Sequence, residues 1–195
     1  MSLTARRLLL LVATAAAVGI TGACGGGEVG TQAAPRDSQL LSYKDSFLSF
    51  AYPAAWTAYP YEKVPELHFR PLVFLSTQPV HDPCSTQGNE TTCGFPVEQL
   101  QPGGVLVMWQ MNGIPAMGLG PGTPIRVGGH PAMRNETAGG ECRSIGADRT
   151  IDVAVELSPL PSPLTYFTAC LRGPDLEQSE KSVDVLLEST KFASK

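Results

Sequence analysis

The chain lacks the short motifs that mark the commonest catalytic sites. It contains no GxSxG or SxxK arrangement for an activated serine, no HExxH zinc-binding helix and no GK[ST] loop for phosphate. Residues 25–30 satisfy the GxGxxG pattern of dinucleotide-binding proteins, but no strand pattern precedes them and no amphipathic helix follows, so they are predicted to form a linker. We therefore expect neither enzymatic activity nor a bound cofactor.

Charged residues are also scarce. They make up 16% of the chain, whereas Gly and Pro number 20 and 17, a composition that favours turns and short strands over long helices with many salt bridges. The net charge is −4, and it becomes −6 for the portion that begins at Cys24, because Arg6 and Arg7 precede it. A binder of duplex nucleic acid needs an excess of Lys and Arg against the phosphates. A β-rich domain with no nucleic-acid partner is predicted.

No apolar run is long enough to span a membrane. The longest, residues 8–20, would form a helix of about 20 Å against a hydrocarbon core of about 30 Å. Because Arg6 and Arg7 precede this run and small residues follow it, the segment is typical of a secretion signal.

The end of this segment, Thr21-Gly22-Ala23-Cys24, resembles a bacterial lipobox, although Thr21 stands where Leu is usual. The resemblance implies a diacylglyceryl thioether on Cys24, which would become the first residue of the mature chain and hold it to the membrane. The alternative is an ordinary signal peptide that is cleaved after Ala23. We expect a signal peptide over 1–23, a flexible tether over 24–38 with a reach on the order of 20 Å, and one globular domain over 39–195.

Five cysteines leave one without a partner in an exported chain, and lipidation of Cys24 would account for it. The other four can pair in three ways. Cys84 and Cys93 bracket a polar, turn-like loop, while Cys142 and Cys170 lie near two strand-like runs, 149–157 and 164–171, that a hairpin would bring together. We predict disulfides Cys84–Cys93 and Cys142–Cys170, which contribute about 2.5 and 3.5 kcal/mol on the loop-entropy model.

Alternation of apolar and polar residues predicts strands in several places. The strand predicted over 46–52 ends at Pro53, where a turn would fold Trp56 back on the core. Gly128-Gly129 interrupts the strand predicted over 126–127 with 132–135. The predicted strands are 46–52, 67–76, 105–111, 126–127 with 132–135, 150–157 and 166–171.

One helix is predicted over 175–187. Gly173-Pro174 introduces it, acidic residues occupy its first turn, and apolar residues recur at helical spacing through Leu186 and Leu187. We further expect an edge strand at 190–192 and a short helix at 97–100. The predicted fold class is α+β, with a single antiparallel sheet of about six strands and the C-terminal helix packed on it.

This pattern resembles actinobacterial lipoproteins with a PsbP-like α/β sandwich. The resemblance rests on residues 46–56, the central Gly129-His130-Pro131-Ala132, the hairpin, and the closing helix that ends at 186–190. It departs from the usual pattern in the cystine-bearing region 79–102, where the first helix of that fold would lie. What it implies is this fold and a non-enzymatic accessory or binding role at the cell envelope, with no catalytic residue to carry over.

The three histidines have structural explanations. His68 alternates with apolar residues and suits a packed or edge position, and His130 follows a turn that requires Gly128 and Gly129 more than an imidazole. His81 lies beside Asp82 in a loop that a cystine would close. Two alternatives remain: a zinc site formed by the thiols with His81 or His68, against which the lack of a CxxC pair argues, and an envelope hydrolase that uses His81, Asp82 and Glu98.

The stretch 113–124 is apolar and nearly uncharged, so it is either a contact surface or a connection packed over the sheet edge. Its candidate contact residues are Ile114, Met117 and Leu119. The leading hypothesis is a lipid-anchored binding or accessory module on the extracytoplasmic face of the cell membrane, with an envelope protein as its partner. The second is a carrier of an apolar small molecule or lipid between helix and sheet, which would need a lined cavity instead of a filled core.

Overall fold

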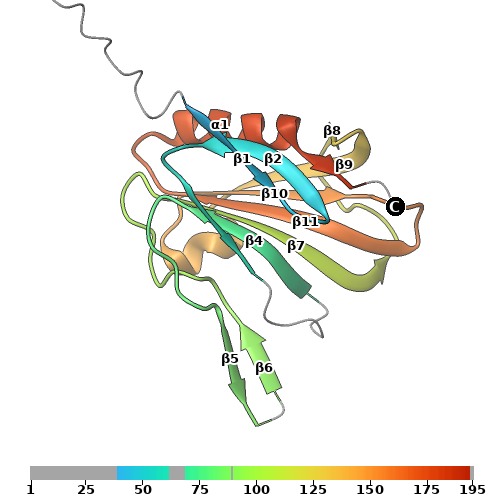
Figure 1. Cartoon of the computed structure of the whole chain (residues 1–195), viewed down its shortest axis with the longest axis horizontal. Helices are drawn as coiled ribbons and strands as arrows, with labels where there is room; N and C mark the ends of the chain where they lie inside the picture. Colours follow the sequence, from blue (N-terminus) through green and yellow to red (C-terminus); the bar gives the residue numbers. More distant parts are fainter. Residues whose placement is uncertain (1–38, 62–68, 89, 194–195) are drawn as a thin grey trace, which may run out of the picture. The chain divides into compact units, whose positions relative to one another are not determined.

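The computed structural model describes residues 39–61, 69–88 and 90–193, all within one compact unit, Ala34–Lys195. The predicted signal peptide, the tether, Cys24 and His68 lie outside the described residues. Most described residues are in strands, and one long helix lies near the C-terminus, as the α+β class requires (Figure 1).

The largest element is a seven-stranded antiparallel sheet in the order β3-β4-β7-β11-β10-β9-β8. Each inner strand places alternate apolar residues on the same face, for example Val105, Val107 and Trp109 in β7. Its strands are β3 Thr57–Pro60, β4 Phe69–Ser76, β7 Val105–Ala116, β8 Thr123–Val127, β9 His130–Ala138, β10 Arg149–Val155 and β11 Ser162–Leu171.

A second, smaller sheet corrects the prediction of a single sheet of about six strands. Strands β1 (Leu40–Lys44), β2 (Leu48–Pro53) and β12 (Lys191–Phe192) pair in the order β1-β2-β12. The predicted first strand, 46–52, therefore belongs to this small sheet and not to the large one. The predicted edge strand at 190–192 is confirmed as β12, on the opposite side of β2 from β1.

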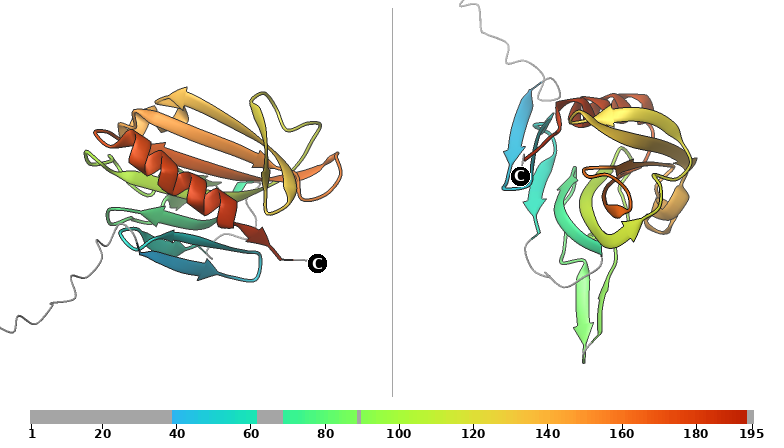
Figure 2. Two further views of the ribbon diagram at one scale, coloured as in Figure 1. Left: turned by 90° about the horizontal axis from the view of Figure 1, so that it is seen from above. Right: turned by 90° about the vertical axis from the view of Figure 1, so that its right-hand side faces the viewer.

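Helix α1 spans Leu176–Ser189, which confirms the helix predicted over 175–187. Asp175 is its N-cap residue and Glu177 lies in its first turn, where carboxylates interact favourably with the helix dipole. Its buried residues, Val183, Leu186 and Leu187, follow helical spacing. The helix and the small sheet lie on the same side of the large sheet (Figure 2).

The main core fills the layer between the large sheet and this cover. Trp109, Phe167 and Ile151 from the large sheet meet Leu48 from β2 and Leu186 from α1, and each of these is no more than 2% exposed. Trp109 and Phe167 pack edge to face with their ring centroids 5.0 Å apart. The predicted fold of Trp56 back on the core is confirmed, since it is 5% exposed.

An ionic network fastens α1 to β9 and β10. Arg134 contacts Asp184, Glu180 and Glu136, and Arg149 also pairs with Glu180. Burial lowers the pKa of the Arg134 guanidinium, but hydrogen bonding and charge from Asp184 and then Glu136 outweigh it and raise the pKa above its ordinary value. Arg134 therefore remains a cation at the helix–sheet junction.

A second, smaller core lies on the other face of the large sheet. The 3₁₀ helix Gly140–Ile145 and the loop that contains Val97 and Leu100 cover that face at one end, over Phe74 and Leu106. The predicted short helix at 97–100 is wrong: these residues form an irregular loop whose apolar side chains fill this core.

Two hairpins differ from the sequence-based expectation. The strand predicted as 126–127 with 132–135 is a hairpin of two strands, β8 and β9, because Gly128 and Gly129 form its turn at φ values of 57° and 83°. A polar hairpin that was not predicted, β5 (Cys84–Gln87) with β6 (Glu90–Cys93), extends away from the large sheet in Figure 1.

Candidate functional site

Both predicted disulfides are present. Cys84–Cys93 joins the facing ends of β5 and β6, and Cys142–Cys170 ties the 3₁₀ helix to β11. Cys170 lies within β11 and not beyond its end, so the second bond fastens a covering segment to the sheet instead of closing a hairpin. Four thiols held as disulfides cannot serve as zinc ligands, which removes the zinc alternative built on them.

The hydrolase alternative requires His81, Asp82 and Glu98 to meet in one site, and the structure gives no support for such a site. Asp82 accepts hydrogen bonds at one oxygen from the Tyr61 hydroxyl (3.1 Å) and the Cys84 amide (3.1 Å), so its carboxylate fastens the base of the hairpin. Burial, then the hydrogen bond and charge of Asp82, raise the pKa of Tyr61. His81 and Glu98 are exposed, and no contact joins them among the residues described.

His130 packs its ring edge to face with Phe192, with centroids 5.6 Å apart, a contact that was not predicted. Residues 39–61, 69–88 and 90–193 contain no cluster of three or more His, Cys, Asp or Glu able to hold a metal ion.

The candidate contact stretch is only partly a loop. Strand β7 continues to Ala116, so Ile114 lies in a strand, and β8 begins at Thr123. Ile114 is 46% exposed and Met117 is 89% exposed, whereas Leu119 is half-buried. Leu119 therefore does not belong to the exposed apolar surface that Ile114 and Met117 form.

Phe69 extends this exposed apolar surface. It is 49% exposed and pairs with Asn112, two residues before Ile114. Phe69 and Ile114 thus lie near each other across β4 and β7, and Met117 directly follows β7; we refer to these three residues as the apolar end of the sheet. The sequence pattern does not indicate Phe69, because only the register between β4 and β7 brings it to the contact stretch.

A polar row on the partly uncovered face of the large sheet was also not predicted. The register places Asn135, Asp152, Thr168 and Met108 side by side across β9, β10, β11 and β7. The Thr168 hydroxyl contacts an Asp152 carboxylate oxygen at 2.9 Å and a Glu141 carboxylate oxygen at 3.3 Å. Glu141 precedes Cys142, so the disulfide to Cys170 holds it above Thr168.

The environment of Asp152 changes its acidity. Burial raises the pKa of the Asp152 carboxyl to about 6, the hydrogen bond from Thr168 opposes this change, and the charge and hydrogen bond of Glu141 add to it. The pair Asp152–Glu141 can therefore hold a proton in mildly acidic solution and present both a hydrogen-bond donor and acceptors to a polar ligand. The only sequence signal was an acid at the outward position of an alternating strand.

A scan against protein-family models and a search of curated proteins each find no match for this chain. Within the described part of the chain, no helix combines the length and the apolar character that crossing a bilayer requires.

Proposed function

We propose that this protein is a lipoprotein of the extracytoplasmic face of a bacterial cell membrane, anchored through Cys24, whose domain is a non-catalytic binding or accessory module. A PsbP-like sandwich is part of this proposal, because the small sheet and the helix lie on the same face of the large sheet. The expected partner is an envelope protein.

The observation that carries the proposal is the pairing of the cysteines. The structure joins four of the five in two disulfides, which leaves Cys24 as the fifth. Two disulfides are typical of a domain that matures outside the reducing cytoplasm. The remaining cysteine stands at the lipobox-like Gly22-Ala23-Cys24, directly after the apolar run, where a lipid anchor would be attached.

The apolar end of the sheet supports the binding role. Phe69, Ile114 and Met117 expose 49%, 46% and 89% of their surface. Large apolar side chains gathered at one place on a domain are typical of contact surfaces, because exposure of an apolar patch to water is unfavourable until a partner covers it. The carrier hypothesis has less support, since the layer between helix and sheet is filled by side chains such as Trp109 and Leu186.

Membrane anchoring is tested by partition into detergent after expression of the full chain in a bacterium. The wild-type chain should enter the detergent phase and shift to a larger, unprocessed form when globomycin blocks the lipoprotein signal peptidase. The variant Cys24→Ser should remain in the aqueous phase, while the control Cys84→Ser/Cys93→Ser should partition as the wild type does. Unchanged partition and size of Cys24→Ser would refute the anchor.

The binding role is tested by a photo-crosslinking amino acid at position 117 in the anchored protein. A defined envelope protein should be captured, and the changes Ile114→Ser and Phe69→Ser should reduce its yield several-fold. The matched control is Val185→Ser on α1, which removes another exposed apolar side chain and should leave the yield unchanged. Equal losses in all three variants would count against the apolar end as the contact.

A further inference from the structure

The outer side of the small sheet has a composition unlike the rest of the domain. Because Leu48, Phe50 and Tyr52 point into the core, the alternate residues of β2 point outward, and the register assigns their neighbours in β1 and β12 to the same side. We call this the outer face of the small sheet; it consists of Leu40, Ser42, Lys44, Ser49, Ala51, Lys191 and the buried Pro53.

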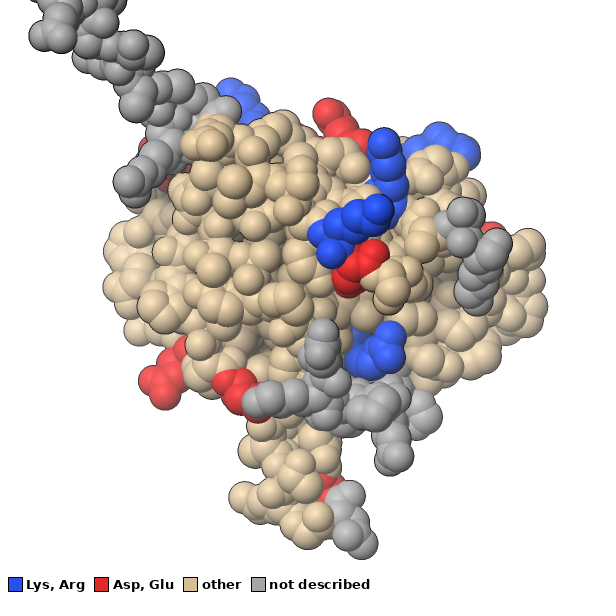
Figure 3. All heavy atoms as spheres, viewed as in Figure 1, with Lys and Arg blue, Asp and Glu red and all other residues tan. Residues whose placement is uncertain are grey.

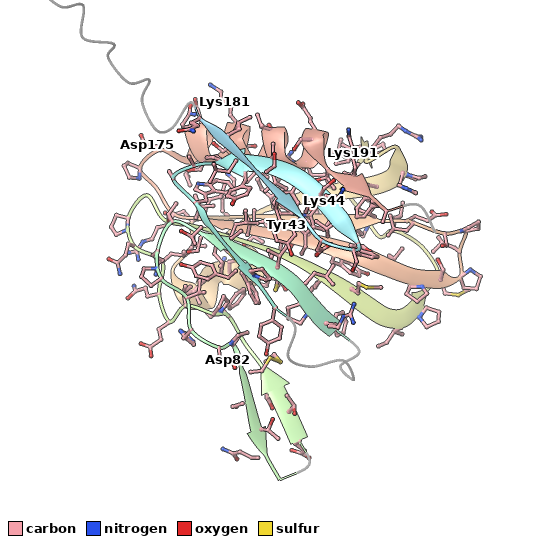
Figure 4. The ribbon with its side chains drawn as sticks, in the orientation of Figure 1. Tyr43, Lys44, Asp82, Asp175, Lys181 and Lys191 are labelled. Atoms are coloured by element: carbon pink, nitrogen blue, oxygen red, sulfur yellow. A yellow bond between two sulfur atoms is a disulfide. The ribbon has the colours of Figure 1, made fainter. Side chains whose placement is uncertain are left out.

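Two lysines lie in one row across this face. Lys44 and Lys191 both pair with Ser49, one from each side, which puts their backbones about 10 Å apart at ordinary strand spacing. Both are exposed and line the same small hollow of about 90 Å³. Figure 4 labels both residues on this side of the molecule, and the same view in Figure 3 shows a largely uncharged surface that carries basic side chains with acidic ones beside them.

A neighbouring acid offsets part of this positive charge without forming an ion pair with either lysine. Asp45 also lines the hollow, but one of its oxygens accepts the amide hydrogens of Phe47 and Leu48 at 2.7 and 2.8 Å, and the other accepts the Tyr43 hydroxyl at 3.0 Å. Within the described residues no carboxylate forms an ion pair with Lys44 or Lys191. The face thus presents positive charge on a chain whose portion from Cys24 onward has a net charge of −6.

Exposed leucines stand at the start of the same strand. Leu40 and Leu41 open β1 and are 50% and 40% exposed. Leu40 lies on the outer face, whereas Leu41 pairs with Tyr52 and faces the other side of the strand. Strand β1 is an edge strand, and it is the first described strand after the stretch that follows Cys24. The tether predicted from the sequence over 24–38 would have a reach on the order of 20 Å, so an anchor at Cys24 would keep β1 within reach of the lipid headgroups.

We propose that the outer face of the small sheet docks on the anionic surface of the bilayer in which Cys24 is anchored. Lys44 and Lys191 bind lipid phosphate groups, and Leu40 enters the headgroup region. This inference rests on the proposed function, because the anchor supplies the high local concentration that lets a small contact area suffice. The acidic remainder of the domain is repelled from the same surface, which favours a single orientation.

The test uses the full lipidated chain in three environments: neutral detergent micelles, vesicles of phosphatidylcholine, and vesicles of phosphatidylcholine with phosphatidylglycerol. Acetylation of each lysine and hydrogen exchange of residues 40–44 are followed by mass spectrometry. We expect several-fold slower acetylation of Lys44 and Lys191 and slower exchange in β1 only in the anionic vesicles. Because 1 M salt shortens the screening length to about 3 Å, high salt should abolish this protection.

Two double variants with the same charge change separate docking from general electrostatics. Lys44→Ser/Lys191→Ser should lose the exchange protection of β1, whereas Arg126→Ser/Lys181→Ser, which removes two cations from β8 and α1, should retain it. A chain that sediments with all vesicles but is equally reactive in every environment would overturn the docking and leave the anchor standing. A chain that fails to associate with any vesicle would overturn both.

Discussion

At the scale of single residues, Asp152 has the clearest pH-dependent property. Its pKa in the folded protein is about 6, against 3.8 for the ordinary carboxyl, so between these values the folded state binds more protons than the unfolded state. Stability should therefore fall as the pH rises from about 4 to about 6 and then level off. Because the side chain is only half-buried, solvent screening reduces the effect to about 1 kcal/mol.

The variant Asp152→Asn should lack this fall. An amide oxygen still accepts the Thr168 hydroxyl, but it carries no charge to desolvate, so the variant should be more stable than the wild type near neutral pH by about 1 kcal/mol. Urea unfolding under non-reducing conditions at a series of pH values measures this difference. The variant Glu141→Gln provides a second comparison, because removal of the neighbouring charge should move the decrease in stability to lower pH. Parallel curves for all three proteins would contradict the assignment.

The turn between β8 and β9 provides a second prediction at this scale. Gly128 and Gly129 both have positive φ, so Ala at either position is strained by about 1 kcal/mol. A Cβ at position 128 would also lie 2.9 Å from the Phe192 ring, whereas one at position 129 would meet nothing within 4 Å. Gly128→Ala should therefore lower the free energy of unfolding more than Gly129→Ala does. Equal effects of the two substitutions would show that Phe192 moves aside.

At the scale of secondary-structure elements, sequence analysis succeeded where apolar periodicity was strong. Strand β10 and helix α1 bury Ile151, Val153, Leu186 and Leu187 as their spacing predicts. Strand β1 was missed because its sequence, LLSYK, exposes both leucines and has no clear alternation. The polar hairpin β5–β6 buries no side chain fully, so its strands are stabilised by the ladder, the disulfide and a Thr86–Thr91 hydrogen bond that periodicity does not reveal.

The two disulfides should differ in their effect on stability although both are native. Replacing Cys142 and Cys170 by Ala should lower the free energy of global unfolding by about 3 kcal/mol, because both residues are buried and the bond fastens the 3₁₀ helix to the sheet. Replacing Cys84 and Cys93 should change it by less than about 1 kcal/mol, below the value of about 2.5 kcal/mol from the loop-entropy model. The reason is that an isolated two-stranded hairpin can open without unfolding the large sheet, so the folded protein also gains chain entropy when this disulfide is lost.

Hydrogen exchange shows whether the loss of each disulfide destabilises one segment or the whole domain. Without Cys84–Cys93, exchange should accelerate in residues 84–93 alone, whereas loss of Cys142–Cys170 should accelerate exchange in β10 and β11 as well. A global loss of similar size for both pairs would mean that the hairpin is more firmly coupled to the domain than its contacts indicate.

At the scale of the whole domain, the division into two sheets depends on contacts far apart in the sequence. Strand β2 pairs with β12 near the C-terminus, and the amide of Ala51 donates to the Ser189 hydroxyl at 2.9 Å. Alternation in 46–52 predicts a half-buried strand but carries no information about which strand it pairs with. For the same reason the sequence did not predict the apolar end of the sheet or the polar row that contains Asp152. Phe69 lies near Ile114, and Glu141 near Asp152, only because the fold brings distant segments together.

The filled layer between helix and large sheet leads to a prediction about the carrier hypothesis. Trp109, Phe167, Ile151 and Leu186 are almost completely buried there and belong to one core cluster, so we expect that layer to have no room for an apolar ligand. Native mass spectrometry of the domain released from membranes should show the protein mass alone, and added fatty acid should not raise its melting temperature. A lipid that survives release and stabilises the wild-type domain would revive the carrier hypothesis.

The variant Leu186→Ala tests whether this layer is truly closed. Truncation removes a side chain with no exposed surface and leaves a cavity, so the free energy of unfolding should fall by about 3 kcal/mol. Such a cavity is apolar and dry, and a small hydrocarbon such as benzene should bind in it and recover part of the loss, as a linkage effect requires. Because the wild-type protein has no such space, benzene should leave its melting temperature unchanged. Stabilisation of both proteins by the same amount would place the ligand elsewhere on the domain.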